Sequence, residues 1–142
     1  DPDAYLYDFV ENLTLLGSGD FKGNGNILDN VIIGNRGANA LAGLAGDDTL
    51  AGGRGNDTLE GGLDADQFVF ARNSDVDTIA DFNQLENDHI QIKGWTNINE
   101  YSDLSGKIRQ VGTSVVINFG DGDRLIISDF DKANLTQDDF IF

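Results

Sequence analysis

The sequence predicts an all-β protein, a parallel β-roll of nonapeptide repeats capped by antiparallel strands at its C-terminal end. Three observations support this fold class. A glycine-rich pattern returns every nine residues between Gly34 and Val69, with Asp or Asn at its sixth position. An apolar residue follows two positions later in every copy, as expected when short repeats stack into a common core. The later sequence contains alternating apolar stretches typical of half-buried strands, and helix signals are weak.

Residues 1–33 are interpreted as irregular N-terminal rungs of the same roll. The stretch Tyr5–Val10 has the composition of a strand. The repeat frame continues backwards into this part, with Asn30 at the sixth position. Leu13 and Phe21 are candidates for earlier apolar rungs, but they fall off the nine-residue period. We therefore expect a degenerate part that stacks on the roll and binds little metal.

The central part, residues 34–69, carries regular copies of G-G-x-G-x-D-x-U-x, where U is a large apolar residue. Glycine at positions one, two and four lets the backbone adopt positive φ, so the chain turns sharply and directs carbonyl oxygens inward. The sixth position adds a carboxylate, and such an all-oxygen set suits a hard cation such as Ca²⁺. The last three positions form a short strand with one inward side chain. We expect these side chains to stack as one ladder: Ile32, Leu41, Leu50, Leu59 and Phe68.

Residues 70–142 are predicted to close the open end of the roll, which we expect to stop coiling near residue 70. A stack of repeats needs a cap at its end, and antiparallel strands can supply it. The expected strands are Gln67–Phe70, Thr78–Ala80, His89–Ile92 and a hairpin of Ser114–Phe119 with Arg124–Ile127. At most, short helical turns are expected around Ile98–Leu104 and Leu135–Asp139, and the last residues are expected to form an edge strand.

Composition limits the classes of partner and activity. The 142 residues suffice for one domain with a modest core, and 25 acidic against 9 basic residues give a net charge of −16. Nucleic acid and anionic membranes are therefore excluded as expected partners. No apolar run approaches membrane-spanning length, and cysteine is absent. The lack of methionine indicates a piece of a longer protein, which we expect to be monomeric as a fragment.

No catalytic motif is recognisable in the chain. His89 is the sole histidine and lies in a strand-like stretch, where a packed or surface role is commoner than that of a base. Neither G-x-S-x-G nor H-E-x-x-H occurs. The many carboxylates could in principle include a glycosidase pair, but their placement in glycine turns has a simpler explanation. We expect a protein that is not an enzyme in this part.

The nonapeptides of this chain resemble those of the RTX (repeats-in-toxin) family of secreted bacterial proteins. The specific match covers residues 34–69. The resemblance implies that two nonapeptides form one coil and that Ca²⁺ lies between turns two repeats apart. Asp48 would then pair with Asp66, and Asn39 with Asp57. The first pair should bind more strongly because it offers two charges. Backbone carbonyls complete the implied ligand set, and the candidates are Gly43, Ala45, Gly52, Gly53, Gly55, Gly61 and Gly62.

Three further acidic residues are candidate ligands. Asp64 replaces the fourth-position glycine, so it either adds a ligand or strains the turn and marks the end of the regular roll. The segment Asp77–Phe82 followed by Asp88 is similar to one found after RTX repeats that helps to hold a last calcium. Asp81 and Asp88 are therefore either ligands or exposed carboxylates. The other polar side chains near the turns are expected to face solvent: Asp47, Asn56, Asp75 and Asp77.

The resemblance implies a secreted, extracellular or cell-surface module that passes the type I secretion machinery unfolded and folds on binding Ca²⁺. The C-terminal residues Leu135–Phe142 also resemble the uncleaved signal that this machinery reads. An alternative is a module that binds an extracellular polysaccharide, like the alginate-contacting modules of mannuronan C5-epimerases. The basic side chains that could contact such a polysaccharide all follow the roll: Arg72, Lys93, Lys107, Arg109, Arg124 and Lys132. The C-terminal region of a large adhesin is a third possibility.

Overall fold

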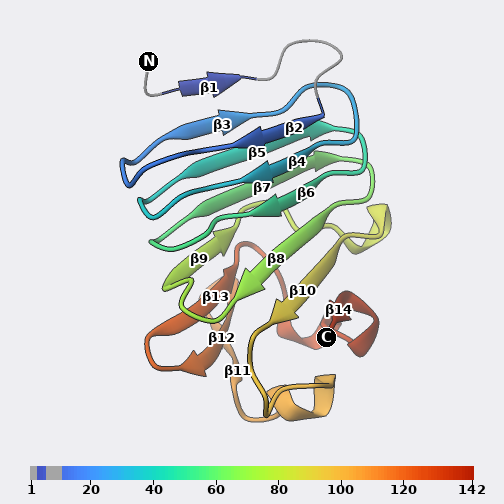
Figure 1. Cartoon of the computed structure of the whole chain (residues 1–142). Coiled ribbons are helices and arrows are strands. Elements are labelled where there is room, and N and C mark those ends of the chain that lie inside the picture. Colours follow the sequence, from blue (N-terminus) through green and yellow to red (C-terminus); the bar gives the residue numbers. More distant parts are fainter. Residues whose placement is uncertain (1–2, 6–10) are drawn as a thin grey trace.

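The computed structural model describes residues 3–5 and 11–142, which form two β-sheets facing each other across a common core (Figure 1). In spatial order, the first sheet contains β1 (Asp3–Tyr5), β3 (Lys22–Asn24), β5 (Ala40–Ala45), β7 (Thr58–Leu63), β9 (Val76–Ile79), β13 (Asp123–Ile127), β12 (Ser114–Gly120) and β11 (Ile108–Val111). The second contains β14 (Phe140–Ile141), β10 (His89–Lys93), β8 (Gln67–Ala71), β6 (Thr49–Ala51), β4 (Val31–Ile33) and β2 (Asn12–Thr14). Most of the expected strand Tyr5–Val10 lies outside the described residues.

Two successive nonapeptides form one coil of the roll, because the chain passes to the opposite sheet after every turn. In the second sheet, β4 pairs in parallel with β6, and Ile32 lies opposite Leu50. In the first sheet, β5 pairs in parallel with β7, and Leu41 lies opposite Leu59. This in-register pairing places equivalent turns of successive coils directly above one another. The predicted all-β parallel roll is confirmed.

The apolar rungs form two ladders, so the prediction of a single ladder is wrong. Rungs nine residues apart belong to opposite sheets, and only rungs one full coil apart lie side by side. The second-sheet ladder comprises Leu13, Ile32, Leu50, Phe68 and Ile90. The first-sheet ladder comprises Leu41, Leu59, Ile79 and Ile127. The two ladders face the same interior, where every rung except Leu13 is at most 1% exposed. Full burial of one such side chain stabilises the fold by about 1.5–3 kcal/mol.

The roll continues well past residue 70, so the expected end of the coil there is wrong. β9 pairs in parallel with β7, and β10 pairs in parallel with β8. The chain can keep coiling without glycine because Asn73 and Asp75 adopt φ of 68° and 66° in the turn between β8 and β9. Inward apolar residues also continue, since Ile79 and Ile90 are fully buried.

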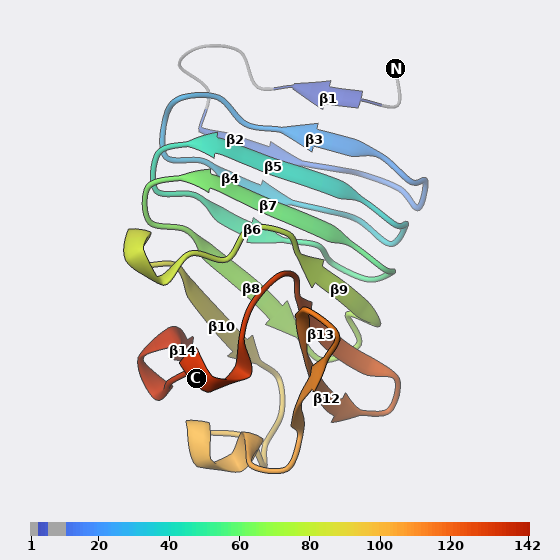
Figure 2. The same cartoon turned by 180° about the vertical axis from the view of Figure 1, so that it is seen from behind.

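The cap is antiparallel only in part. β12 and β13 form the predicted hairpin (Figure 2), and β11 pairs antiparallel with β12 on its other side. β13 itself extends the first sheet in parallel with β9, and β14 pairs in parallel with β10 as the expected edge strand. Among the described residues, the helical elements are short 3₁₀ turns, and two of them fall in the expected stretches: η2 (Tyr101–Leu104) and η4 (Gln137–Asp139), besides η1 (Gln84–Glu86) and η3 (Lys132–Asn134). None of the helices in this described part is long and apolar enough to cross a membrane.

The N-terminal rungs stack on the roll as expected. β2 pairs in parallel with β4, and Leu13 lies opposite Ile32 although it is off the nine-residue period. Phe21 is not a rung, because Gly23 occupies the register position opposite Leu41 in the first sheet. The core therefore thins toward the N-terminal end.

Candidate metal centre

The turns of the nonapeptides lie in two rows along opposite edges of the roll (Figure 1). Row 1 comprises the turns Gly25–Asn30, Gly43–Asp48 and Gly61–Asp66, which lead into β4, β6 and β8. Row 2 comprises the turns Gly34–Asn39 and Gly52–Asp57, which lead into β5 and β7. Turns of one row stack at intervals of one coil, so oxygen atoms of successive turns gather between them.

Three of the five turns, Gly43–Asp48, Gly52–Asp57 and Gly61–Asp66, have left-handed backbone at the second and fourth positions. In the turn Gly52–Asp57, Gly53 and Gly55 have φ of 103° and 96°. The same backbone is adopted where glycine is missing, since Leu44 has φ of 90° and Asp64 has φ of 77°. Side chains with a Cβ rarely occupy this region and are strained there. The left-handed turns therefore do not require glycine at every such position, and the turns Gly25–Asn30 and Gly34–Asn39 form without positive φ there.

The sixth-position side chains form hydrogen-bonded ladders in both rows. In row 1, the backbone N–H of Asn30 donates to Oδ1 of Asp48 at 2.7 Å. The N–H of Asp48 donates in turn to Oδ1 of Asp66 at 3.0 Å. In row 2, the N–H of Asn39 donates to Oδ1 of Asp57 at 2.7 Å. One oxygen of each carboxylate is therefore engaged by the coil before it.

The second oxygen of four such carboxylates is buried without a hydrogen-bond donor among the described residues. These atoms are Oδ2 of Asp48, Asp57, Asp66 and Asp77. Buried polar groups in native proteins are almost always partnered, and each unpaired group costs about 1–3 kcal/mol, more when it is charged. When ionised, these carboxylate oxygens can only accept, so a proton or a cation is the partner that satisfies them.

The first-position glycines border the space in which these free oxygens lie. A Cβ built on Gly43 would collide with Oδ2 of Asp48, and it would lie 2.6 Å from the carbonyl oxygen of Gly61 in the next coil. A Cβ on Gly61 would likewise collide with Oδ2 of Asp66. A carboxylate oxygen and a carbonyl oxygen of successive coils thus converge beside Gly43. This oxygen-only surrounding fits a hard divalent cation such as Ca²⁺.

Burial is the main cause that raises the pKa of these carboxylates. The pKa is raised to about 6 for Asp48 and Asp57, to about 7 for Asp66 and to about 8 for Asp77. The backbone N–H donors act in the opposite direction but do not outweigh the loss of water. A cation beside these groups favours their charged form and so removes the shift.

Side chains alone do not make a metal site here. Across residues 3–5 and 11–142, no three or more Asp, Glu, His or Cys side chains gather closely enough to hold an ion. A cation in the turns would therefore depend on backbone carbonyls as well as on the carboxylates. The nonapeptide spacing predicts such a mixed ligand set, which stays a prediction.

The other candidate acidic residues bind the backbone. Asp64 is exposed, and its Oδ2 accepts the N–H of Gly46 at 3.3 Å; its left-handed φ does not end the roll. Asp81 is half-buried and accepts the N–H groups of Gly61 and Gly62, each at 2.9 Å. Asp88 is buried rather than exposed, and it accepts the N–H of Asp66 and of Asn83 at 3.0 and 2.8 Å. A role of these three carboxylates as ligands stays a prediction.

The expectation that Asp77 faces solvent is wrong. Asp77 is fully buried, and its Oδ1 accepts the N–H of Asp57 at 3.0 Å, which continues the row 2 ladder. The regular spacing of the repeats did not predict this position. Asp77 follows Asp57 by 20 residues and not by the 18 that separate Asn39 from Asp57. A usable signal was the triplet Asp77-Thr-Ile, which repeats the Asp-Thr-Leu that begins at Asp48. The expected exposure is confirmed for Asp47, Asn56 and Asp75.

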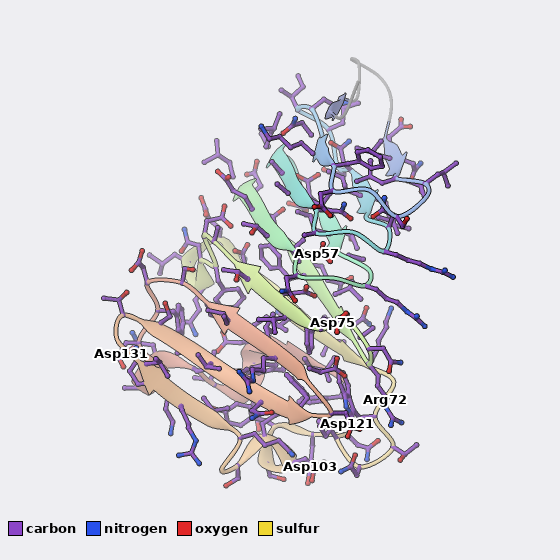
Figure 3. The ribbon with its side chains drawn as sticks, turned by 90° about the vertical axis from the view of Figure 1, so that its left-hand side faces the viewer. Asp57, Arg72, Asp75, Asp103, Asp121 and Asp131 are labelled. Atoms are coloured by element: carbon purple, nitrogen blue, oxygen red, sulfur yellow. The ribbon has the colours of Figure 1, made fainter. Side chains whose placement is uncertain are left out.

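A view of the row 2 edge shows Asp57 and Asp75 above Arg72 and Asp121, where the roll meets the hairpin (Figure 3). Arg72 and Asp121 form an exposed salt bridge at 3.4 Å, the one ion pair within the described part of the chain. The other basic side chains that are candidates for polysaccharide binding thus have no acidic partner within 4 Å in that part.

Comparisons with known proteins agree with this geometry. A family model of four copies of the RTX calcium-binding nonapeptide repeat matches residues 24–59, 33–68 and 42–77. Together these matches cover residues 24–77, which is less than half of the chain. No curated protein sequence matches the chain.

Two solved structures share the fold. The solution structure of the AlgE6R3 subunit from the Azotobacter vinelandii mannuronan C5-epimerase has a TM-score of 0.69, with 23% identity, over 96% of this chain and 86% of that one. The extracellular lipase LipA from Serratia marcescens has a TM-score of 0.65, with 20% identity, over 91% of this chain. This chain spans only 20% of the lipase, so the shared fold is one part of that larger protein.

Proposed function

We infer that this chain, which carries RTX calcium-binding nonapeptide repeats over residues 24–77, is a non-catalytic module whose folding is driven by Ca²⁺. One observation carries the inference: four buried carboxylate oxygens lack a hydrogen-bond donor, and that of Asp48 lies beside the carbonyl oxygen of Gly61 in the next coil. Such a set is costly in the folded chain unless a cation neutralises it. In the unfolded chain the same oxygens are scattered, so the ion binds the folded form and its binding energy becomes folding energy.

Asp48 and Asp66 are the leading pair in this proposal. Both side chains are at most 2% exposed, and each has one free oxygen. The pair of Asn39 and Asp57 offers one charge only, so it should bind more weakly. An ion at about 100 times its dissociation constant adds about 2.7 kcal/mol of stability. Two such ions approach the lower end of the net stability of a domain, about 5–15 kcal/mol.

Folding outside the producing cell is part of the proposal. The chain would stay loose where calcium is scarce, because 25 acidic residues repel one another, and would condense where calcium is abundant. This behaviour would suit passage through a type I secretion channel as an unfolded chain. The match in fold to a part of an extracellular lipase supports a module of a larger secreted protein.

The first test compares isosteric substitutions at the paired positions. Asp48→Asn or Asp66→Asn should raise the calcium concentration at the midpoint of folding by about tenfold or more, since each change removes a ligand charge. Asn39→Ala should raise it less. Circular dichroism titrated with Ca²⁺ measures the midpoint, and Asp47→Asn on the exposed fifth position serves as the control. A larger effect from Asn39→Ala than from the Asp variants contradicts the assignment of the sites.

A second candidate function is binding of an acidic polysaccharide, supported by the shared fold with a subunit of a mannuronan C5-epimerase. A hollow of about 490 Å³ lined by Tyr101, Ile108 and Lys132 lies near the exposed Arg109. The net charge of −16 opposes this function unless Ca²⁺ bridges the two polyanions.

Calorimetric titration with oligo-alginate in calcium tests the second candidate. Binding that is lost in Lys132→Ala and Arg109→Ala supports it, with Lys22→Ala at the far end of the roll as the control. The absence of heat with the unmodified chain contradicts it.

A further inference from the structure

The outer face of the second sheet carries no acidic side chain on its roll strands. Side chains alternate between core and solvent along a strand, and the register aligns the outward residues of successive coils in two columns. The first column, which β14 extends, comprises Thr14, Ile33, Ala51, Val69, Gln91 and Ile141. The second comprises Asn12, Val31, Thr49, Gln67 and His89. Neither column contains Asp, Glu, Lys or Arg, although the chain has 25 acidic residues.

The centre of this face is apolar and open to solvent. Val31 is 40% exposed and Ile33 is 41% exposed, and the neighbouring Ala51 and Val69 are half-buried. In Figure 1 this sheet faces the viewer, and none of the described segments passes in front of β4, β6 or β8. Contiguous exposed apolar surface of this kind marks interaction sites on soluble proteins.

The net charge limits which surface can meet a second copy of the chain. At −16, two copies repel each other over most of their surface. The outer face of the first sheet carries exposed charged side chains at its outward positions: Lys22, Glu60, Arg109 and Arg124. The uncharged columns of the second sheet are therefore the face at which two copies can approach with the least electrostatic cost.

The row 2 edge beside this face carries arginines. Arg36 and Arg54 hold the third position of the turns Gly34–Asn39 and Gly52–Asp57. Both side chains are exposed and have no acidic partner within 4 Å in the described part of the chain. These two turns end β4 and β6 on the row 2 side, so the two cations lie one coil apart.

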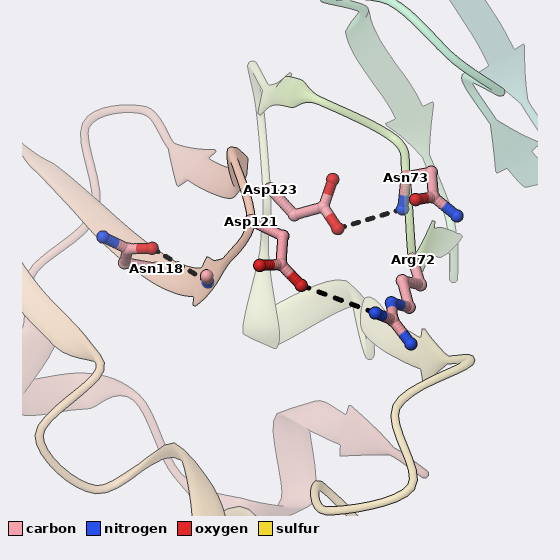
Figure 4. A network of polar contacts seen from close by, with 6 residues as sticks. Arg72, Asn73, Asn118, Asp121 and Asp123 are labelled. Carbon is pink, nitrogen blue, oxygen red and sulfur yellow. Dashed lines mark hydrogen bonds and ion pairs between the residues drawn. The ribbon is translucent and has the colours of Figure 1, made fainter.

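Arg72, in the next coil of row 2, is already engaged within the molecule. It pairs with Asp121 of the hairpin of β12 and β13 at 3.4 Å (Figure 4). The same hairpin holds the turn through Asp123, whose Oδ2 accepts the N–H of Asn73 at 2.9 Å and whose Oδ1 accepts the N–H of Asp75 at 3.1 Å. Arg36 and Arg54 are thus the row 2 arginines that are available to a partner.

The row 1 edge carries exposed carboxylates, and its turns contain no basic residue. Oδ1 of Asp29 accepts the N–H of Asp47 at 2.9 Å, and Oδ1 of Asp47 accepts the N–H of Ala65 at 3.0 Å. These bonds fix the two carboxylates at intervals of one coil. Asp29 and Arg36 consequently lie on either side of β4, and Asp47 and Arg54 lie on either side of β6.

Symmetry converts this distribution into a contact between copies. A two-fold axis parallel to the stack of coils, in front of the second sheet, places each strand over the same strand of the second copy and row 1 over row 2. Asp47 then faces Arg54 of the other copy, and Asp29 faces Arg36. A two-fold axis along the strands would instead place row 1 on row 1 and oppose like charges, so charge complementarity selects the first arrangement.

We propose that the outer face of the second sheet binds a second copy of this chain in a two-fold dimer. Val31, Ile33 and Val69 form its apolar centre, and Asp47–Arg54 and Asp29–Arg36 pairs form its rims. Such an isologous contact closes on itself and stops at two copies. Five strands about 4.8 Å apart give a face at the small end of specific interfaces, so the dimer should be weak and concentration-dependent. The monomer expected from the sequence would then be the dilute state only.

Sedimentation equilibrium of the full chain in excess Ca²⁺ tests the face. The unmodified protein should show a dimer that grows with concentration, without larger species. Ile33→Lys should weaken it by more than about tenfold, because it places an unpaired charge at the apolar centre, although it lowers the net negative charge. Ile126→Lys, at an outward position of the first sheet, is the matched control and should not. Equal association of both variants overturns the choice of face, and a monomer at every concentration or growth beyond two copies overturns the dimer.

A charge exchange tests the orientation. Arg54→Glu and Asp47→Arg should each weaken self-association by about tenfold, since like charges then meet at both rims. An equimolar mixture of the two variants should restore it, because every contact again joins an acid and a base. Arg124→Glu, on the first sheet, changes the net charge as Arg54→Glu does and should have little effect. Circular dichroism shows whether each variant keeps its fold. Failure of the mixture to recover overturns the pairing of row 1 with row 2.

Discussion

At the residue scale, Leu44 adopts a left-handed backbone that favours glycine. It holds the second position of a row 1 turn with φ of 90°, where the equivalent Gly53 and Gly62 have 103° and 112°. A side chain in this backbone region is strained by about 1–3 kcal/mol. The side chain of Leu44 is half exposed, so it offsets only part of that cost by burial.

Leu44→Gly should therefore stabilise the calcium-loaded protein by about 1 kcal/mol, after the entropy cost of glycine, about 0.5–1 kcal/mol, is subtracted. Leu63→Gly is the matched control. The side chain of Leu63 is also exposed, at 61%, but its φ is not positive. Its replacement by glycine should therefore only destabilise the protein. Urea unfolding in excess Ca²⁺ measures both changes, and a loss of stability in Leu44→Gly contradicts the strain argument.

The buried carboxylates predict an unusual pH dependence of the calcium-free chain. The pKa of Asp66 is raised to about 7 and that of Asp77 to about 8, mainly by burial. A raised pKa in the folded state means that the folded chain binds the proton more tightly than the unfolded chain, whose pKa is about 3.9. The contribution of these two carboxyl groups to the stability of the folded chain is complete below pH 4 and is lost as the pH rises through 7 to 8.

In calcium-free buffer, the free energy of unfolding should therefore be higher at pH 5 than at pH 8. The affinity for Ca²⁺ should change in the opposite sense, because protons compete for the same oxygens below about pH 7. Asp66→Asn removes one of the shifted groups, so the difference between the two pH values should shrink in that variant. Urea unfolding at both pH values measures this difference. Greater stability at pH 8 than at pH 5 without calcium would contradict the raised pKa of the buried carboxylates.

At the scale of elements, the periodic part of the fold follows from the sequence and the rest does not. The nine-residue period identifies the turns and inward residues of the central part, because each coil repeats the same local chemistry. It cannot show that Leu41 and Leu50 face each other from opposite sheets, since that depends on pairing one coil apart. The continuation through Ile79 and Ile90 was hidden by turns that use Asn73 and Asp75 in place of glycine.

The candidate site is predictable to the same extent. Asp48, Asp57 and Asp66 are found by their phase, and the structure gives each of them a buried free oxygen. Asp77 was missed because β8 is two residues longer than β6, so the phase shifts at that strand. Asp123 could not be found, because its contact with the turn arises only when the hairpin packs on the roll.

The ladders predict where the roll is held by apolar packing. Leu59 lies between Leu41 and Ile79 in the first sheet and is 1% exposed. Leu59→Ala should destabilise the calcium-loaded protein by about 2–5 kcal/mol, the usual cost of a cavity in a core. Leu85→Ala, at a side chain that is 94% exposed, should change stability by less than about 0.5 kcal/mol. Chemical unfolding of both variants measures the difference, and similar values would mean that the ladder does not support the fold.

At the scale of the whole molecule, the apolar core and the ion sites share the stabilisation. The core of the regular coils is narrow, because the strands β4, β5, β6 and β7 each contribute one inward apolar side chain. The chain meanwhile carries a net charge of −16, which opposes any compact state. The free carboxylate oxygens lie in both rows, so neutralising them stiffens both edges of the roll at once. In the proposed function, bound cations would supply the stabilisation that a wider hydrophobic core supplies in other domains.

Removing calcium should accordingly unfold or greatly weaken the protein. Two ions held at about 100 times their dissociation constants contribute about 5 kcal/mol together. For a chain of this length, 1 kcal/mol shifts the midpoint of thermal unfolding by roughly 2–8 °C, so chelation should lower it by at least about 10 °C. Differential scanning fluorimetry with EDTA and with excess Ca²⁺ measures the shift. Mg²⁺ is the control ion, because its preference for six short octahedral bonds and retained water should leave it unable to restore the midpoint. Equal melting with and without chelator would show that the carboxylates in the turns do not need a cation, and the calcium-driven fold would have to be abandoned.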